Sequence, residues 1–233
     1  MAEVNRRFII SLGGSLIVPD SIDTVFLENF RTAVFSLLDE GNAFLIIPGG
    51  GATARRYQKA ASVLGVTDRE TLDWVGIKAS RGNAQLLHAL LGEVVYPEVV
   101  MDNALVSRIS APVIIAAGGA PGRSSDAGSV ELAQAAGVDT IINLSNVAHV
   151  YSRDPRLNPD AEAYREISWK DYRSLIPQEW DPGLSTPFDP VASKMAEVSG
   201  LTVAILDGHD IPSFEQFVRT GVCKGTIIRN GKA

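Results

Sequence analysis

The sequence predicts an α/β fold in which a mostly parallel sheet carries helices on both faces. Three observations lead to this class. Short β-rich apolar runs alternate with longer segments of helical periodicity, the first two runs stop at glycine-rich turns, and the pattern repeats downstream. Alternation of this kind is typical of parallel sheets whose strands are joined by helices.

Six apolar runs are the predicted strands. Residues 8–12 end at the pair Gly13-Gly14, and residues 43–47 are closed by Pro48 and three glycines. Short apolar runs bounded by turn residues are typical of buried strands. The other four predicted strands are residues 94–96, 112–117, 140–144 and 202–206.

Five segments have the pattern of helices. In residues 25–40 the apolar side chains recur at helical spacing, and Gly41 follows as a suitable C-terminal cap. Residues 73–91 form a longer helix with apolar residues spaced along it. The remaining predicted helices are residues 53–64, 129–136 and 190–199.

Composition bounds the class of protein. The chain has 233 residues, enough for one large α/β domain or two small ones with a sizeable core. Its 27 acidic and 21 basic side chains give a net charge of −6, which argues against a general nucleic-acid-binding surface but not against a small phosphorylated ligand. No run reaches the ~18 apolar residues of a membrane span, so we expect no membrane partner.

The single cysteine, Cys223, excludes an intramolecular disulfide and a zinc site built from cysteines. A reducing, cytoplasmic compartment is therefore the simplest expectation. The first residues are polar, and Gly13 interrupts the apolar run that follows them, so we expect no signal peptide.

Sheets of this class bind ligands at the carboxyl ends of their strands. The first strand runs into Gly-Gly-Ser at residues 13–15, where consecutive N–H groups form either an anion-binding nest or an ordinary tight turn. The second strand ends in three glycines at residues 49–51, where free N–H groups at a helix start favour an anion. On that helix, Arg55 is either a phosphate ligand or a solvated arginine.

A third strand leads into residues 118–126, Gly-Gly-Ala-Pro-Gly-Arg-Ser-Ser-Asp. This loop combines backbone donors, two hydroxyls, an arginine and a carboxylate, which together suit a phosphate and a sugar. Ser125 or Asp126 can instead be only the N-cap of the following helix. That simpler interpretation explains one residue and not the whole loop.

Two further strand ends carry polar groups. Residues 145–151, with Asp154 just beyond, offer an amide, an aromatic ring and an acid that would suit a nucleoside, although Asn and Asp are also turn residues. Lys194 lies one turn into a helix, where a cation is unusual, so it indicates either a bound anion or a side chain lying on the surface. Together the strand ends predict a phosphate-binding edge of the sheet.

Other motifs do not fit. Residues 49–54 match G-x-G-x-x-A, but no strand ending in an acid follows about 20 residues later, so we reject a nicotinamide or flavin site. The chain has neither a G-x-x-x-x-G-K-[ST] P-loop nor a G-x-S-x-G elbow. His88, His149 and His209 are dispersed, so we predict no metal site built from side chains.

Six stretches cover nearly the whole chain: SLGGSL (11–16), PGGGATARRY (48–57), DWVGIKASRGNAQLL (73–87), GGAPGRSSDAG (118–128), SNVAHVYSRDP (145–155) and FDPVASK (188–194). In their order and approximate spacing they resemble the amino acid kinase superfamily, and within it the archaeal-type uridylate kinases. The set is far more specific than any one glycine loop.

The resemblance implies a single domain over residues 1–233, a three-layer αβα sandwich with the acceptor site mainly in the N-terminal part and the ATP site mainly in the C-terminal part. It implies Mg²⁺ as cofactor and transfer of the γ-phosphoryl group of ATP to UMP, in pyrimidine nucleotide biosynthesis. It also implies a homo-oligomer, a hexamer built as a trimer of dimers.

The resemblance also implies roles for individual residues. The acceptor nucleotide would contact Gly50, Asp73, Ala120, Pro121, Gly122, Arg123, Ser124 and Ser125. The donor phosphates would lie along Gly13, Gly14, Ser15, Gly51 and Arg55, and the adenosine against Ser145, Asn146, Tyr151 and Asp154. Lys194, Asp126 and Arg55 would surround the reacting phosphates, Lys194 neutralising charge and Asp126 orienting the lysine. Phosphoryl transfer needs this positioning and cationic stabilisation.

Three features depart from the family pattern. They are Ser11 in place of a lysine, Ala148 and His149 in place of an acid and a glycine, and Ala120 in place of a threonine. Arg6 and Arg7 are candidate substitutes for the lysine. Two alternatives stay open: a sibling kinase with another small phosphate or carboxylate acceptor, and a non-catalytic nucleotide- or oxyanion-binding protein similar to the molybdenum storage branch.

Overall fold

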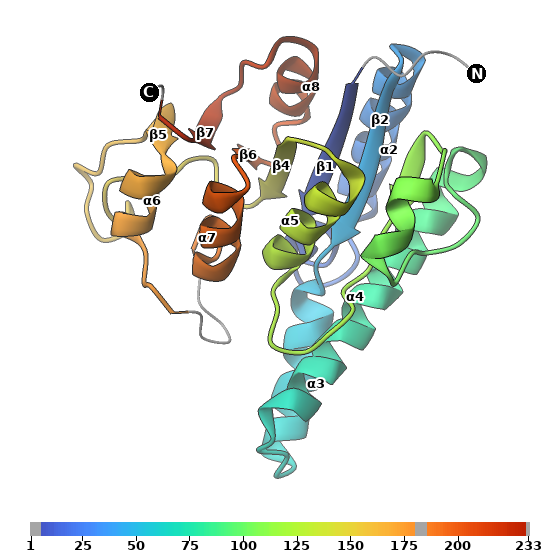
Figure 1. Ribbon diagram of the computed structural model, residues 1–233. Helices are drawn as coiled ribbons and strands as arrows, with labels where there is room; N and C mark the ends of the chain where they lie inside the picture. Colours follow the sequence, from blue (N-terminus) through green and yellow to red (C-terminus); the bar gives the residue numbers. More distant parts are fainter. Residues whose placement is uncertain (1–5, 180–185, 232–233) are drawn as a thin grey trace.

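The computed structural model describes residues 6–179 and 186–231, which form a seven-stranded sheet with helices around it (Figure 1). The strand order is β3-β2-β1-β4-β6-β7-β5. Neighbouring strands are parallel except β6 and β7, which are antiparallel. The strands are β1 Arg6–Leu12, β2 Asn42–Pro48, β3 Val113–Ile115, β4 Thr140–Ser145, β5 Glu166–Ser168, β6 Thr202–Asp207 and β7 Gly225–Arg229.

Most of the helices in the described ranges follow a residue whose side chain caps them. The helices are α1 Gly14–Ile17, α2 Thr24–Asp39, α3 Gly51–Val63, α4 Arg69–Leu91, α5 Ser125–Ala136, α6 Trp169–Leu175, α7 Pro190–Val198 and α8 Ile211–Thr220, with the 3-10 helices η1 Gly92–Val94 and η2 Asn103–Arg108. Asp23 and Asp68 cap α2 and α4 by accepting first-turn N–H groups. Gly41 follows the end of α2 with a φ of 82°, as expected for a helix C-terminus.

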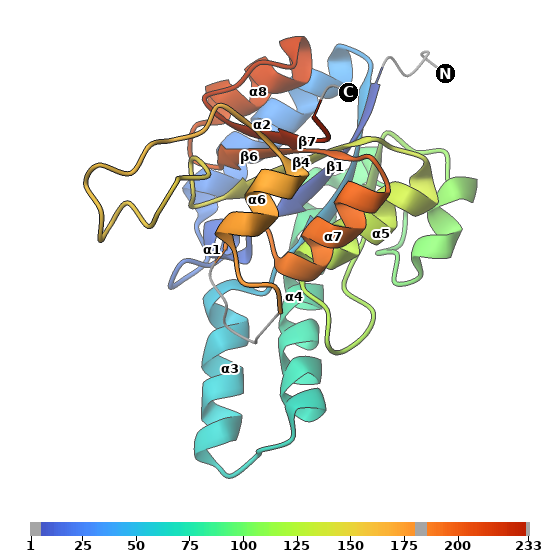
Figure 2. The ribbon, with the colours of Figure 1, turned by 60° about the vertical axis from the view of Figure 1, so that its left-hand side comes forward.

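Alternate residues of the strands point to opposite faces of the sheet, and each face has its own layer of helices. Phe8 and Ile10 of β1 pack in a core with α2, α4 and α8. Ile9, between them, packs in a second core with α5, α6 and α7. Figures 1 and 2 show these layers on either side of the sheet. The predicted three-layer αβα sandwich with a mainly parallel sheet is confirmed.

The predicted strand at residues 94–96 is wrong. Gly92 ends α4 with a φ of 62°, and the chain continues directly into η1, so it is still turning at residue 94. Within residues 94–96 the chain meets the sheet edge only in an isolated bridge of Val95 to Val113, with the N–H of Tyr96 donating to the carbonyl oxygen of Val113 at 2.9 Å. Three apolar residues are too few to show whether they follow a strand or a turn.

The sequence patterns did not indicate β5, β7, α1, α6, α8 or the two 3-10 helices. β5 has three residues, of which only Ile167 is buried, so it has no readable alternation. The predicted helices at 73–91 and 129–136 each begin four residues earlier, because Asp68 and Ser124 cap their first turns.

Helices α3 and α4 form a hairpin that projects beyond the sheet (Figure 2). Tyr57, Val63 and Leu64 on this hairpin are exposed apolar residues. None of the helices in the described ranges is both long enough and apolar enough to cross a membrane.

Candidate active site

The strand order distributes the predicted site residues along one edge of the sheet. β1 is central, with β2 and β3 on one side of it and β4 and β6 on the other. The predicted acceptor residues follow β2 and β3, and the predicted adenosine residues follow β4. The first glycine loop, after β1, therefore lies between the two sets.

The glycine loops after β1 and β2 pack backbone against backbone. A Cβ atom on Gly14 would overlap the nitrogen of Gly51, and one on Gly51 would overlap the carbonyl oxygen of Gly14. Gly51 also has a φ of 61°, which L side chains rarely adopt. The N–H of Gly13 donates to the carbonyl oxygen of Leu144 at 2.7 Å, which joins the loop to β4. The structure thus brings Gly13, Gly14 and Gly51 together at the centre of the edge.

Ser15 and Arg55 lie beside these loops. Nη1 of Arg55 is 3.5 Å from Oγ of Ser15, so α1 and α3 present a hydroxyl and a guanidinium side by side. Gly50 is the N-cap of α3 and has no side chain with which to cap it. A cation next to an uncapped helix N-terminus favours an anion.

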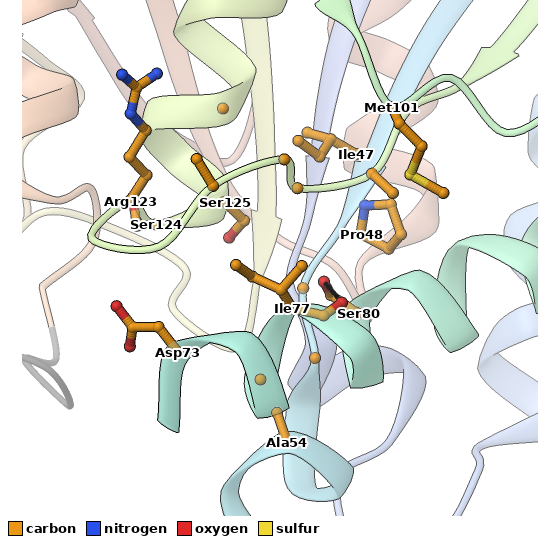
Figure 3. Close-up of a pocket in the computed structure, with 18 of the residues that line it drawn as sticks. Ile47, Pro48, Ala54, Asp73, Ile77, Ser80, Met101, Arg123, Ser124 and Ser125 are labelled. Atoms are coloured by element: carbon orange, nitrogen blue, oxygen red, sulfur yellow. Dashed lines mark hydrogen bonds between the residues drawn. The ribbon is translucent and has the colours of Figure 1, made fainter. Parts of the chain in front are cut away.

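A cavity of about 510 Å³ lies over the ends of β2 and β3. Figure 3 shows Asp73, Ile77 and Ser80 of α4 opposite the loop that carries Arg123, Ser124 and Ser125. Of the predicted acceptor residues, Gly50, Asp73, Ala120, Arg123, Ser124 and Ser125 line the cavity. Pro121 and Gly122 do not, but the N–H of Gly122 donates to Oδ2 of Asp73 at 2.8 Å and so ties the loop to α4.

The residues of this loop also have structural partners. Ser124, rather than Ser125 or Asp126, is the N-cap of α5, and its Oγ accepts the N–H of Ala127 at 3.0 Å. Arg123 forms an ion pair with Glu131. Ser125 begins α5 and lines the cavity.

A second cavity, of about 740 Å³, lies beyond the end of β4. The predicted adenosine residues Asn146, Tyr151 and Asp154 line it. Ser145 ends β4 beside the cavity, and its Oγ accepts the N–H of Val147 at 3.2 Å. The Arg156 guanidinium holds the pKa of Asp154 below its usual range, so Asp154 stays ionised at neutral pH.

His149 contributes an unusual group to the same cavity. Its Nδ1 is buried and has no hydrogen-bond partner among the described residues. The imidazole meets the Tyr151 ring edge-on, with centroids 6.0 Å apart. The cavity wall therefore contains one buried polar atom that is left without a protein partner in the described part of the chain.

Asp126 and Lys194 lie on neighbouring helices, α5 and α7. Asp126 accepts a hydrogen bond from Oγ of Ser11 at 3.1 Å and another from the backbone N–H of Asp189 at 3.1 Å. Burial and the nearby Asp189 carboxylate raise the pKa of Asp126 to about 7. Lys194 is exposed and forms no ion pair with the described part of the chain. Its orientation by Asp126 therefore stays a prediction.

A family model described as the amino acid kinase family matches residues 6–207. The chain belongs to this family. Uridylate kinase of Methanospirillum hungatei JF-1 is 35% identical over 96% of this chain and 95% of its own length. Uridylate kinase of Methanocorpusculum labreanum is 33% identical over 96% of each. The crystal structure of uridylate kinase from Archaeoglobus fulgidus superimposes with a TM-score of 0.82 at 28% identity, covering 95% of this chain and 99% of that one.

Sequence reasoning missed two residues that shape the cavity over β2 and β3 in this member of the amino acid kinase family. Nε and Nη2 of Arg81 both donate to the carbonyl oxygen of Gly118 at 3.2 Å. Nδ2 of Asn83 donates to the carbonyl oxygen of Gly49 at 2.8 Å. The signal that would have found them is the presence of polar residues within the apolar pattern of α4, about two helical turns beyond Asp73.

Arg6 and Arg7 do not replace the lysine that many members of the amino acid kinase family have at the position of Ser11. Both begin β1, at the opposite end of that strand from Gly13, and Nη2 of Arg6 donates to the carbonyl oxygen of Arg219 at 2.9 Å. Ser11 is itself buried. The position therefore holds a neutral hydrogen-bond donor to Asp126 rather than a cation.

The described residues contain no group of three or more His, Cys, Asp or Glu side chains that could hold a metal ion. A cluster of protein ligands is not required for Mg²⁺, because this ion is commonly bound through substrate phosphates and waters with only one or two carboxylates. The glycine loops at this edge of the sheet, predicted to bind phosphate, fit a nucleotide that brings its cation with it.

Proposed function

We propose that this protein is a uridylate kinase, which transfers the γ-phosphoryl group of ATP to UMP and gives UDP and ADP in pyrimidine nucleotide biosynthesis. The full-length similarity to proteins named uridylate kinase supports UMP as the acceptor. The observation that carries the proposal is the arrangement of two cavities on either side of the central glycine loop. Two nucleotides bound in these cavities would direct their phosphates toward that loop.

UMP would occupy the cavity over β2 and β3, in the N-terminal part of the chain. Gly50 and Asp73 would face the nucleotide, and the loop at residues 120–125 would hold its sugar and phosphate. The bond from Gly122 to Asp73 supports this role, because it holds the loop in a closed shape around the cavity. Arg81 would keep the start of the same loop in place through Gly118.

ATP would lie with its adenosine in the cavity beyond β4, against Ser145, Asn146, Tyr151 and Asp154. Its phosphates would run along residues 13–15, Gly51 and Arg55. The close packing of the two glycine loops supports this path, because it brings the start of α1 and the start of α3 together at the centre of the edge.

The chemistry requires positioning and charge neutralisation more than a base. The acceptor is already a phosphate anion, so no proton has to be removed before it attacks. Lys194 would place its ammonium group on the oxygens of the transferring phosphoryl group, and Arg55 would hold the donor phosphates. Asp126 would act behind Lys194 rather than on the substrate. Mg²⁺ brought in on the ATP phosphates would supply the remaining positive charge.

We also propose that the protein works in the cytoplasm as a hexamer built as a trimer of dimers. The apolar residues Tyr57, Val63 and Leu64 support association, because several exposed apolar side chains on one projecting hairpin are suited to burial between copies. Light scattering coupled to size-exclusion chromatography tests the hexamer, and a monomeric mass would refute it.

The proposed activity is tested by coupled assays of ADP release with UMP, CMP, AMP and isopentenyl phosphate as acceptors, with Lys194→Ala as a background control. We expect UMP to give the highest kcat/KM. A higher value with another acceptor would favour a sibling kinase. Binding of ATP and UMP with no turnover of any acceptor would favour the storage-like alternative, which nothing in the site presently supports.

A further inference from the structure

The N-termini of α5 and α7 are joined by a reciprocal pair of hydrogen bonds. Ser124, the N-cap of α5, donates from Oγ to Oδ2 of Asp189, which is the N-cap of α7. In return, the backbone N–H of Asp189 donates to Oδ2 of Asp126, in the first turn of α5, at 3.1 Å. Each helix therefore supplies part of the other's cap, and the two helix starts are held together.

The start of α7 is held from several directions. Oδ1 of Asp189 accepts the N–H of Ala192 at 2.8 Å, and its carbonyl oxygen accepts the hydroxyl of Ser193 at 2.6 Å. The backbone of the preceding residue, Phe188, bonds through both its N–H and its carbonyl oxygen to the hydroxyl of Tyr172. Asp189 is only 6% exposed. A side chain held this firmly fixes the direction in which α7 leaves the site.

Asp126 and Asp189 form a carboxylate cluster without a cation. Neither makes an ion pair within residues 6–179 and 186–231. The groups that face Asp126 are the hydroxyl of Ser11 from β1, Asp189 from α7 and the phenol of Tyr172 from α6. Burial keeps that phenol neutral by raising the pKa of Tyr172. Burial and the like charge of Asp189 both disfavour ionisation of Asp126 and raise its pKa.

We propose that Asp189 is a positioning residue that couples the acceptor loop to the helix bearing Lys194 and acts through its charge on the neighbouring Asp126 carboxyl group. This inference rests on the proposed function, which gives Lys194 its role on the transferring phosphoryl group. Lys194 follows Asp189 by five residues on the same helix, so the lysine moves with the start of α7. The loop that would hold the acceptor phosphate and the lysine that would act on the transferring phosphoryl group are thereby held at a fixed distance from each other.

The same contacts separate the roles of two adjacent serines. The hydroxyl of Ser124 donates its only proton to Asp189 and accepts the N–H of Ala127, so it has no proton to offer a phosphate. Ser125 begins α5 and lines the acceptor cavity. The family resemblance gives both serines to the acceptor, whereas the geometry points to Ser125 as the phosphate ligand and to Ser124 as part of the coupling.

The first test is the Asp189→Asn variant of the full-length protein, with the titration of the Asp126 carboxyl group followed by ¹³C NMR. Asparagine keeps an oxygen for the N–H of Ala192 but has no charge, so Asp126 loses its like-charged neighbour. We expect the Asp126 midpoint, about pH 7 before substitution, to fall by roughly one pH unit or more. An unchanged midpoint would overturn the electrostatic coupling of Asp189 to Asp126, whatever reaction the protein catalyses.

The second test measures the pH dependence of kcat with ATP and UMP. In Asp189→Asn, the pH below which kcat falls should shift downward together with the NMR midpoint of Asp126. If the pH profile of kcat does not shift, the positioning role is overturned. Ser124→Ala should lower kcat with little effect on the KM for UMP, whereas Ser125→Ala should raise that KM. The reverse pattern would overturn the assignment of the two serines.

Asp171→Asn is the matched control, because Asp171 is an exposed aspartate in the first turn of the neighbouring helix α6. It should leave both the midpoint and the pH profile of kcat in place. If Asp189→Asn does not fold, Asp189→Ser retains a capping hydroxyl without the charge and must give the same shifts. A shifted midpoint in a protein that phosphorylates no UMP would refute the proposed function while supporting the coupling of Asp189 to Asp126.

Discussion

Gly14 and Gly51 approach each other so closely that neither can carry a Cβ atom without overlapping the backbone of the other. They belong to different loops, after β1 and β2, and their contact brings the N-termini of α1 and α3 together. The site depends on this contact, because it places Ser15 and Arg55 side by side at the centre of the sheet edge.

We therefore predict that Gly14→Ala destabilises the protein by about 3 kcal/mol or more, at the upper end of overpacking costs, because rigid backbone surrounds the added methyl group. Gly82→Ala is the control. Gly82 lies in α4, where an added Cβ meets nothing within 4 Å, so that variant should gain about 0.5–1 kcal/mol. Urea unfolding measures both, and equal midpoints for the two variants would contradict the prediction.

A second prediction concerns the bond between Asp73 and the N–H of Gly122, at 2.8 Å. Asp73→Ala removes the acceptor that ties the loop to α4, and we expect the KM for UMP to rise roughly tenfold, the equivalent of one charge-assisted hydrogen bond. Asp73→Asn keeps an oxygen for Gly122 and should have a smaller effect. Steady-state kinetics of both, with Glu70→Ala as a control on the exposed start of α4, provides the check. Similar KM values for Asp73→Ala and Glu70→Ala would refute the role of the bond.

The third prediction follows from the pKa of Asp126, about 7 in the folded protein against 3.8 for an ordinary aspartate. The folded state binds this proton more tightly than the unfolded state does, so the contribution to stability is complete below about pH 4 and is lost as the pH rises through 7. The loss amounts to roughly 4 kcal/mol at most, the free-energy equivalent of the shift. Asp126→Asn should remove this slope.

Urea unfolding of the unsubstituted protein and of Asp126→Asn, each at pH 5 and at pH 8, measures the contribution of Asp126. The quantity compared is the difference in unfolding free energy between the two proteins at each pH. The comparison is needed because other acids have the opposite sign, such as Asp68, whose hydrogen bonds with Thr71 lower its pKa. The stability gap between the two proteins should change between the two pH values, in the direction that disfavours the unsubstituted protein at pH 8. A constant gap would show that Asp126 ionises normally.

Much of this site could be predicted because its residues follow strands directly in the sequence. The apolar run at residues 8–12 identified Gly13 and Gly14 as a strand end, and parallel sheets place such ends at one edge. The roles of individual loop residues were less accessible. Ser124 caps α5 although Ser125 and Asp126 were the expected caps, because cap choice depends on backbone direction within a loop.

The pairing of Ser11 with Asp126 was beyond sequence reasoning for a different reason. The two residues are 115 positions apart, and their contact requires α5 to cover the face of the sheet to which Ser11 points. Alternation gives Ser11 the same face as Ile9, but only the observed packing shows that α5 covers that face. Edge elements such as β5 were missed because one buried residue in three leaves no pattern.

The last prediction concerns Lys194. Loss of one group that stabilises the transition state lowers kcat by a factor of ~10² or more, so we expect Lys194→Ala to do so with little change in the KM for UMP. Stability should not change, because Lys194 is exposed and forms no ion pair in the described ranges. Lys170→Ala removes an exposed lysine from the first turn of α6 and should leave kcat unaltered. If both variants retain full kcat, the positive charge that phosphoryl transfer requires comes from elsewhere, and Arg55 becomes the next residue to substitute.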